Sequence, residues 1–379
     1  MSYFLIFLAI YVFLCYKYTK WDCDYLERYY RPLFYQKDKN SPKIDVHSLY
    51  PEFCVKDKLN FTRLLIGNIL FAPFKLFLEI LCAIFCITMM KYYSLTLKNP
   101  TTNPEERKKI EWVEYISCYV AFYIVHGLRL HEKKLPYEDV YKKYLGPDYD
   151  FNQKDYSLII CNHIGFFEVA INMIKYSCGF IAKKDIRNYY FVGTIAELIG
   201  CLFVDRENEN ARKKIFEELE KRQRDYYNKK NLCPLVLFPE GTTTTGNHIL
   251  KYKKGAFYAL LPIKPEIINI YHEDEYHVAI GAANVVMSSL RSLAYLTINM
   301  YFVDLPVINP TEYMFEKYKD LGKEKWEIFA EVTRKIICEI GGFTPSDKTF
   351  RDQKKYAKAM ITGIYSEEDI DISEAELKK

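Results

Sequence analysis

The chain lacks the cysteine spacing of a metal site or a disulfide framework. Its 11 cysteines are scattered over 379 residues and form no Cys-x-x-Cys pair, which argues against structural zinc and against paired cystines. Cys82 and Cys86 share one helix face inside an apolar run, and most cysteines are expected to be small buried side chains. This usage fits a reduced, cytosol-facing compartment. An EF-hand loop is also lacking, so no metal is expected.

A strong charge of either sign is absent as well. The net charge is +4, and no basic stretch interleaves with aromatic residues, which argues against a nucleic-acid partner. Aromatic residues are plentiful, with 34 Tyr and 25 Phe, and amphipathic rings suit the headgroup region of a membrane. A biased overall composition would give the same counts. The net charge is compatible with a mildly basic surface that faces a membrane.

The N-terminus carries an apolar run without the features of a cleaved signal peptide. Residues 3–16 are apolar and precede Lys17 and Lys20, with neither a basic start nor a small-residue cleavage site. We therefore expect a hydrophobic N-terminal anchor over residues 1–20, with its lysines on the cytosolic side. Residues 21–60 contain three prolines and are predicted to form an irregular connector.

A second apolar stretch covers residues 64–90. As a straight helix it would be about 40 Å long, enough to cross a bilayer. Pro73 would kink such a helix, and Lys75 and Glu79 are spaced to pair on one face. These features favour a membrane-embedded or re-entrant helical element over residues 61–110, although a plain span stays open. Basic residues flank both ends, so the positive-inside rule does not decide.

The remaining sequence predicts an α/β domain over residues 111–345. A helix is expected at 113–125, another at 210–228, and one or two closing helices at 311–342. The predicted fold class is α/β, a mixed sheet flanked by helices and preceded by a membrane-associated helical element. Residues 346–379 are expected to be a polar tail, disordered in part. Strand-like runs occur at residues 157–161, 201–204, 234–238, 266–271 and 296–303.

Two polar motifs follow strand-like runs and stand about 75 residues apart. In the first, Asn162 to Glu168, His163 lies five positions before a carboxylate, a spacing typical of a general base with an orienting partner. The second, Phe238 to Gly246, places a carboxylate and four threonines in a turn that contains glycine. Polar turns after buried strands indicate an active site at the strand ends of an α/β sheet.

Two further blocks complete an ordered series of four. Gly200 to Arg206 lies between the two motifs, and Leu261 to Pro265 follows them. With these blocks in this order, residues 65–310 resemble the glycerolipid acyltransferase family, which acylates glycerol 3-phosphate and lysophospholipids with acyl-CoA. The run from Phe238 to Phe257 is most similar to the lysophosphatidylcholine and lysophosphatidylethanolamine acyltransferase branch. Thr243 stands where the lysophosphatidic-acid branch usually has arginine.

The resemblance implies that His163 is the general base and Glu168 its partner. Histidine suits this role because its ordinary pKa of about 6.5 lies near the working pH. The acceptor hydroxyl attacks the thioester itself, so no serine or cysteine nucleophile is required. The family pattern has aspartate at the position of Glu168, and a carboxylate displaced by about 1 Å can lower a rate on the order of a hundredfold. A catalytically weakened lipid-binding protein is therefore an alternative. A lone histidine, without the other blocks, would more often be a core residue.

The resemblance also implies an acceptor-binding group. Arg206 matches the arginine that is implicated in holding the acceptor's phosphate, and a guanidinium fits phosphate oxygens in a bidentate fork. A surface ion pair is the alternative for Arg206. Glu240, Gly241 and Thr242 resemble the acceptor-binding turn, in which glycine allows close backbone approach. Glu240 is expected to accept from a hydroxyl or to position Arg206.

The sequence thus predicts a membrane-bound acyl-CoA-dependent acyltransferase. The expected acceptor is lysophosphatidylcholine or lysophosphatidylethanolamine, the co-substrate is acyl-CoA, and no cofactor is needed. A glycerol-3-phosphate or lysophosphatidic-acid acyltransferase is the alternative enzyme. The expected partners are the lipid bilayer and the two substrates, without nucleic acid. The expected location is the endoplasmic reticulum membrane, with a cytosol-facing active site.

Overall fold

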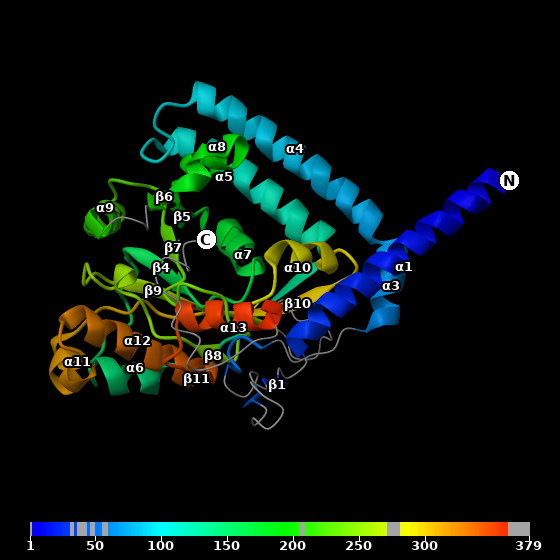
Figure 1. Ribbon diagram of the computed structural model, residues 1–379. Coiled ribbons are helices and arrows are strands. Elements are labelled where there is room, and N and C mark those ends of the chain that lie inside the picture. Colours follow the sequence, from blue (N-terminus) through cyan, green and yellow to red (C-terminus); the bar gives the residue numbers. More distant parts are fainter. Residues whose placement is uncertain are drawn as a thin grey trace.

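A seven-stranded mixed sheet forms the centre of the α/β domain in the computed structural model (Figure 1). The structure describes residues 2–30, 34–35, 44–45, 50–54, 60–204, 209–270 and 281–362. The strand order is β3-β10-β9-β4-β7-β5-β6. Neighbouring strands are parallel except for β10 and β9, which are antiparallel. The bounds are β3 (Leu128–Glu132), β4 (Leu158–Cys161), β5 (Gly179–Lys183), β6 (Leu202–Val204), β7 (Leu235–Leu237), β9 (Ile263–Ile270) and β10 (Ile298–Asp304).

The predicted fold class and all five predicted strands are confirmed. Every residue of β4 is buried, as expected for a central strand of a largely parallel sheet covered on both faces. Strands β3 and β5 are not among the predicted strands. In β3, side chains such as Arg129 and His131 alternate with apolar ones at the sheet edge, so the apolar run that marks a buried strand is missing.

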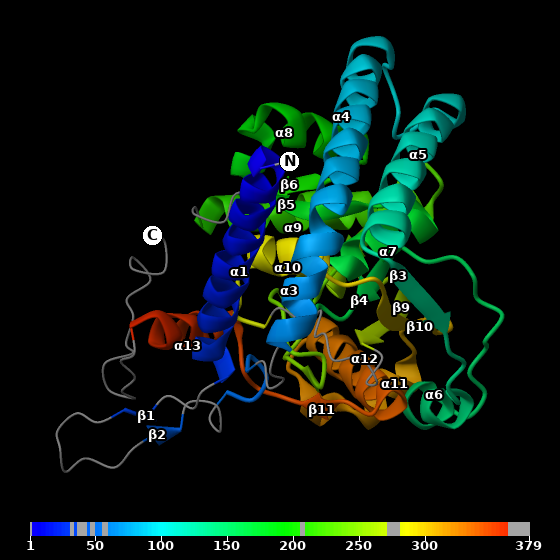
Figure 2. The ribbon, with the colours of Figure 1, turned by 90° about the vertical axis from the view of Figure 1, so that its right-hand side faces the viewer.

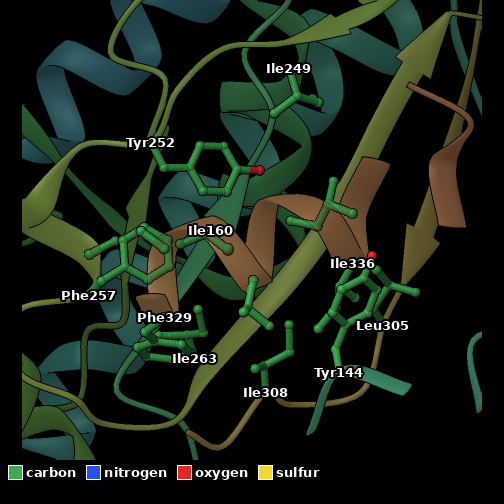
Figure 3. Packing of buried hydrophobic residues seen from close by; sticks show 14 of the residues in the cluster. Tyr144, Ile160, Ile249, Tyr252, Phe257, Ile263, Leu305, Ile308, Phe329 and Ile336 are labelled. Atoms are coloured by element: carbon green, nitrogen blue, oxygen red, sulfur yellow. The ribbon is translucent and has the colours of Figure 1, made fainter. Parts of the chain in front are cut away.

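Helices cover both faces of the sheet. Leu158 and Ile160 of β4 belong to one apolar cluster, and Ile159 and Cys161 belong to the other, because successive side chains of a strand point to opposite faces. Figure 3 shows the first cluster, in which Phe329 and Ile336 of a closing helix pack against the sheet. This face carries α6 (Glu138–Leu145), α11 (Glu312–Lys317), η4 (Lys319–Leu321) and α12 (Lys325–Gly341), and the second cluster includes residues of α7 (Phe167–Tyr176). The closing helices predicted at 311–342 are confirmed.

The N-terminal third contributes long helices. They are α1 (Ser2–Tyr30), α3 (Phe61–Leu70), α4 (Ala72–Thr96), α5 (Pro104–Cys118) and a π-helical segment η1 (Tyr119–Val125). The predicted irregular connector is wrong for residues 21–30, which continue α1. This C-terminal part of α1 packs against the rest of the chain, where the side chains of Asp22 and Leu26 are buried. Two helical segments, Phe4–Leu26 and Ala72–Thr96, are long and apolar enough to cross a membrane.

The predicted break at Pro73 is confirmed, but the predicted ion pair beside it is wrong. Phe71 separates α3 from α4, and Pro73 lies in the first turn of α4. The Lys75 ammonium donates to the carbonyl of Tyr295, and the Glu79 carboxylate lies 3.5 Å from Nε2 of His126. Both side chains point toward the α/β domain, so each has a partner there.

The remaining elements complete the domain. The predicted helix at 210–228 is confirmed as α9. The prediction of a partly disordered tail is wrong for residues 350–362, which form α13, because Tyr356 is buried against Tyr50 and Phe53. Residues 363–379 lie outside the described residues. The helices and strands not yet given bounds are β1 (Phe34–Tyr35), β2 (Ile44–Asp45), η2 (Lys184–Asn188), α8 (Tyr190–Leu198), α9 (Glu209–Tyr227), β8 (His248–Ile249), η3 (Lys254–Ala256), α10 (Val285–Ser292), β11 (Thr344–Pro345) and α13 (Phe350–Thr362).

Candidate active site

His163 lies two residues beyond the carboxyl end of β4. The side chain of the preceding Asn162 forms two hydrogen bonds with the backbone of Ile268 in β9: Nδ2 donates to the carbonyl at 2.8 Å, and the N–H donates to Oδ1 at 2.9 Å. The imidazole of His163 stacks on the ring of Phe238, with centroids 4.1 Å apart and planes inclined by 14°. The backbone and the ring are thus fixed, while 22% of the side chain remains exposed.

Glu168 reaches the imidazole from the first turn of α7. Its Oε1 lies 2.6 Å from Nδ1 of His163 and also accepts the N–H groups of Ile164 at 3.0 Å and Gly165 at 2.7 Å. The positive end of the helix dipole favours a carboxylate at this place. The side chain is fully buried. The stem is one methylene longer than that of aspartate, and this fold accommodates it without loss of the contact.

This contact defines the chemistry available to the ring. A carboxylate that accepts at Nδ1 places the proton of the neutral imidazole on Nδ1 and leaves Nε2 as the acceptor. Among the residues that the structure describes, Nε2 of His163 has no hydrogen-bond partner. A partly exposed histidine whose ring is held by a buried carboxylate has the arrangement of a general base.

Glu240 connects the two motifs. Its Oε1 accepts the backbone N–H of His163 at 3.0 Å, and its Oε2 accepts the N–H of Leu250 at 2.9 Å. The side chain is buried, and desolvation raises the pKa of its carboxyl to about 8. Both oxygens face the backbone, so the geometry makes Glu240 a residue that positions His163. It does not present Glu240 to an acceptor hydroxyl.

Gly241 forms the tight part of the turn. Its φ of 72° lies in the left-handed region, and its N–H donates to the carbonyl of Phe238 at 3.0 Å. A Cβ at this position would come within 2.2 Å of the Lys253 ammonium nitrogen. Glycine is therefore favoured by the backbone conformation, and the flexible cationic side chain of Lys253 lies against the turn.

The threonines of the turn divide into two groups. The hydroxyls of Thr243, Thr244 and Thr245 donate to backbone carbonyls at 2.7, 3.4 and 3.5 Å. Thr242 is buried, and its hydroxyl has no hydrogen-bond partner within the described part of the chain. Of the four, Thr242 is thus the hydroxyl left for another molecule. The N–H of Thr244 donates to the carbonyl of His163 at 2.8 Å, which connects this turn to His163.

Sequence reasoning missed a residue that holds the turn. Gln353 of α13 donates to the carbonyl of Thr243 at 3.3 Å, to its hydroxyl at 3.2 Å and to the carbonyl of Gly281 at 2.8 Å. No local signal pointed to it, because Gln353 belongs to the segment predicted as a polar tail.

The predicted Arg206 lies outside the described residues. Within those residues, no group of three or more His, Cys, Asp or Glu side chains is placed to hold a metal ion.

A histidine paired with a buried carboxylate lies at the strand ends of this α/β sheet, and the comparisons with known proteins point to acyl transfer. Residues 145–273 match the model of the Acyltransferase family. The resemblance to the glycerolipid acyltransferases is thereby confirmed over the matched residues.

Two similar proteins are named as lysophospholipid acyltransferases. Lysophospholipid acyltransferase LPEAT1 of Arabidopsis thaliana is 28% identical over 210 residues, which cover 55% of this chain and 50% of that protein. Lysophosphatidylcholine acyltransferase 1 of Homo sapiens is 24% identical over 199 residues, covering 52% and 34%. The chain thus spans half or less of the length of these curated relatives.

One solved structure is also similar. The crystal structure of the 1-acyl-sn-glycerophosphate acyltransferase PlsC from Thermotoga maritima matches with a TM-score of 0.43 and 16% sequence identity. The match covers 71% of this chain and 96% of that one.

Proposed function

We propose that this chain is a membrane-bound acyltransferase that transfers an acyl chain from acyl-CoA to the hydroxyl of a lysophospholipid. The observation that carries the proposal is the contact of 2.6 Å between Nδ1 of His163 and the buried Glu168 carboxylate, with Nε2 left to act as base. The names of LPEAT1 and of the lysophosphatidylcholine acyltransferases support a lysophospholipid as the acceptor.

The proposed reaction is a direct transfer. Nε2 of His163 removes the proton of the acceptor hydroxyl as that oxygen attacks the thioester carbonyl carbon. The C–S bond then breaks, and the imidazolium returns the proton to the departing CoA thiolate, so protons and electron pairs balance. Glu168 stabilises the imidazolium that forms between these steps and keeps the ring in its tautomer. Phe238 fixes the plane of the ring.

The acceptor-binding side of the reaction is assigned to the turn. We place Thr242, Gly241 and Arg206 against the acceptor's headgroup, as the resemblance implies. Thr242 supplies a hydroxyl, Gly241 permits close approach of the backbone, and Arg206 supplies a cation for phosphate. Lysophosphatidylcholine and lysophosphatidylethanolamine are the preferred acceptors. Glycerol 3-phosphate and lysophosphatidic acid are tested beside them.

The apolar helices support attachment to a membrane. One side of α4 faces the domain along most of its length, at Lys75, Glu79, Cys82 and Met90. The other side exposes large apolar residues: Phe74, Phe77, Ile80, Leu81, Ile84, Tyr92 and Leu95. A helix docked lengthwise on its own domain is better placed to lie along the bilayer surface than to cross it. We assign the membrane to the endoplasmic reticulum and the active site to its cytosolic side.

The test uses membranes from cells that express the wild type, His163→Ala or His131→Ala. The last is the matched control, because His131 lies on the edge strand β3 and contacts Asn299. Labelled oleoyl-CoA is supplied with each of the four acceptors separately. We expect a labelled phospholipid with the wild type and with His131→Ala, and none above background with His163→Ala. A product that persists in His163→Ala would refute the proposed mechanism.

A further inference from the structure

Helix α13 holds the turn that follows β7 and carries Thr242. We call residues 240–246 the acceptor turn. The side-chain amide of Gln353 donates to the carbonyl of Thr243 at 3.3 Å and to its hydroxyl at 3.2 Å. It also donates to the carbonyl of Gly281 at 2.8 Å. A single side chain of α13 thus fixes the residue that follows Thr242.

The start of α13 reaches the other side of Thr242 through a lysine. The Lys253 ammonium lies 5.7 Å from the centroid of the Phe350 ring, a distance at which an aromatic face attracts a cation. The same ammonium lies against Gly241, since an added Cβ there would come within 2.2 Å of its nitrogen. Helix α13 therefore contacts the acceptor turn directly at Thr243 and, through Lys253, at Gly241.

Residues 50–54 hold the far end of the acceptor turn. The N–H of Thr245 donates to the carbonyl of Glu52 at 2.8 Å. The carboxylate of Glu52 accepts the hydroxyl of Ser346 at 2.6 Å, and both side chains are buried. Ser346 lies just before α13. The segment and the C-terminal part of the chain are thus bonded to each other as well as to the acceptor turn.

An apolar cluster joins both segments to the N-terminal helix. Tyr356 of α13 is fully buried, and its ring centroid lies 6.1 Å from that of Tyr50 and 6.4 Å from that of Phe53. Leu26 of α1 belongs to the same cluster, and α13 lies beside the C-terminal end of α1 in both ribbon views (Figure 1 and Figure 2). This packing fixes α13 and with it the position of Gln353.

We propose that α13 and residues 50–54 form a clamp on the acceptor turn, and that Gln353 is a positioning residue for the lysophospholipid. The inference rests on the proposed function, in which the Thr242 hydroxyl contacts the acceptor's headgroup. Gln353 acts through Thr243, the next residue along the turn. With Thr243 held, the Thr242 hydroxyl is ordered before the acceptor arrives, and a preordered group loses less conformational entropy on binding.

The chemical step is expected to depend less on the clamp. The ring of His163 is held by Glu168, whose Oε1 lies 2.6 Å from Nδ1, and by Phe238, on which it stacks. Neither residue belongs to the acceptor turn or to the clamp. The clamp therefore acts on the affinity for the lysophospholipid, whereas kcat depends mainly on His163 and Glu168.

The first experiment tests the clamp without using activity. Gln353→Glu keeps the shape of the side chain but replaces the amide donor with a carboxylate that faces the carbonyls of Thr243 and Gly281. Gln353→Met removes the donor and adds no charge. Lys355→Gln is the matched control on the same helix, because it changes the net charge by as much as Gln353→Glu does. Hydrogen exchange of the backbone N–H groups is measured on the full chain in phosphatidylcholine vesicles.

The reporter is the N–H of Thr245, which donates to the carbonyl of Glu52. We expect the peptide that contains it to exchange about tenfold faster in both Gln353 variants, and at the wild-type rate in the control. Peptides from β4 should exchange as in the wild type. An unchanged rate at the acceptor turn in either Gln353 variant would overturn the proposal. So would faster exchange in β4 as well, because Gln353 would then act on the whole fold.

The second experiment separates acceptor binding from chemistry. Initial rates of the wild type and the three variants are measured with the acceptor that gives the highest rate, first varying that acceptor and then varying oleoyl-CoA. We expect the KM for the acceptor to rise about tenfold in both Gln353 variants, with kcat and the KM for oleoyl-CoA changed by less than about twofold. A fall in kcat at an unchanged acceptor KM would refute the role in acceptor binding. A wild type inactive with every acceptor would refute the proposed function instead, and the exchange rates would still decide whether the clamp holds the turn.

Discussion

Glu168 Oε1 accepts three hydrogen bonds at once, from Nδ1 of His163 and from the N–H groups of Ile164 and Gly165. One oxygen thus orients the imidazole of His163 and also satisfies the backbone just before α7. Substitutions at Glu168 therefore act on catalysis and on local structure, and a useful variant must separate the two.

Glu168→Gln is expected to lower kcat by a factor on the order of a thousand while the protein stays folded. The amide can still accept the backbone N–H groups through its oxygen. It cannot stabilise the imidazolium by charge, and it can hold the ring in the wrong tautomer. Turnover and thermal unfolding are measured in parallel.

Glu168→Asp is the matched control, since it keeps the charge and shortens the stem by one methylene. We expect it to retain more activity than Glu168→Gln, because it keeps the negative charge that stabilises the imidazolium. If Glu168→Gln turned over substrate as fast as the wild type, the negative charge of Glu168 would not contribute to catalysis.

Glu240→Gln is expected to impair the enzyme through the position of His163. An amide has one oxygen where the carboxyl group has two, so its NH2 group would face the N–H of either His163 or Leu250. A buried donor left unsatisfied costs about 1–3 kcal/mol. We expect a lower denaturation midpoint and a fall in kcat, with the KM for the lysophospholipid changed less than kcat. A rise in KM alone would instead indicate direct contact with the acceptor.

Sequence reasoning predicted the parts whose signals are local. Strands β4 and β7 are continuous apolar runs, and the spacing of His163 and Glu168 brings the two together within one strand-loop-helix unit. Both patterns can be recognised in short stretches of sequence, without knowledge of the rest of the fold.

The unpredicted parts depend on contacts between distant segments. Glu240 reaches the backbone of His163 across 77 residues, and Gln353 reaches Thr243 across 110. Lys75 and Glu79 are spaced to pair on a helix, yet their partners on the domain take both side chains. Local spacing states which groups can meet, whereas tertiary packing decides which ones do.

Glu266→Gln is expected to stabilise the protein at alkaline pH. Glu266 is buried in β9, accepts a hydrogen bond from the Tyr176 hydroxyl, and its Oε2 has no partner among the described residues. Desolvation raises its pKa from 4.5 to about 8. A raised carboxyl pKa means that the folded state favours the protonated form. Its contribution to stability is therefore complete below pH 4.5 and is lost as pH rises through about 8.

The free energy of unfolding of Glu266→Gln and of the wild type should be compared at pH 5 and pH 9. We expect similar values at pH 5 and a variant more stable by at least about 1.4 kcal/mol at pH 9, which corresponds to one pKa unit. Glu114 and Glu240 also have a pKa raised to about 8 by burial. The variant should therefore keep part of the pH dependence. A variant less stable than the wild type at pH 9 would contradict the assignment.

Asp22→Ala is expected to loosen the attachment of α1 to the domain. Arg291 of α10 donates from Nε to Oδ2 of Asp22 at 2.7 Å and from its terminal nitrogen to Oδ1 at 2.6 Å, and both side chains are buried. Removal of the carboxylate leaves a buried guanidinium without its ion-pair partner, which costs about 3–5 kcal/mol. Asp24, two residues further along α1, is exposed, so Asp24→Ala provides the matched control.

The measurement is the unfolding midpoint together with the rate at which protease cleaves α1 from the domain. We expect a lower midpoint and faster cleavage for Asp22→Ala, and wild-type values for Asp24→Ala. The double variant Asp22→Leu/Arg291→Met should recover most of the loss, because no buried charge remains in it. If the double variant were as unstable as Asp22→Ala, the loss would come from packing at this point of α1. If Asp22→Ala behaved as Asp24→Ala does, the ion pair would not be what fixes the N-terminal helix to the acyltransferase domain.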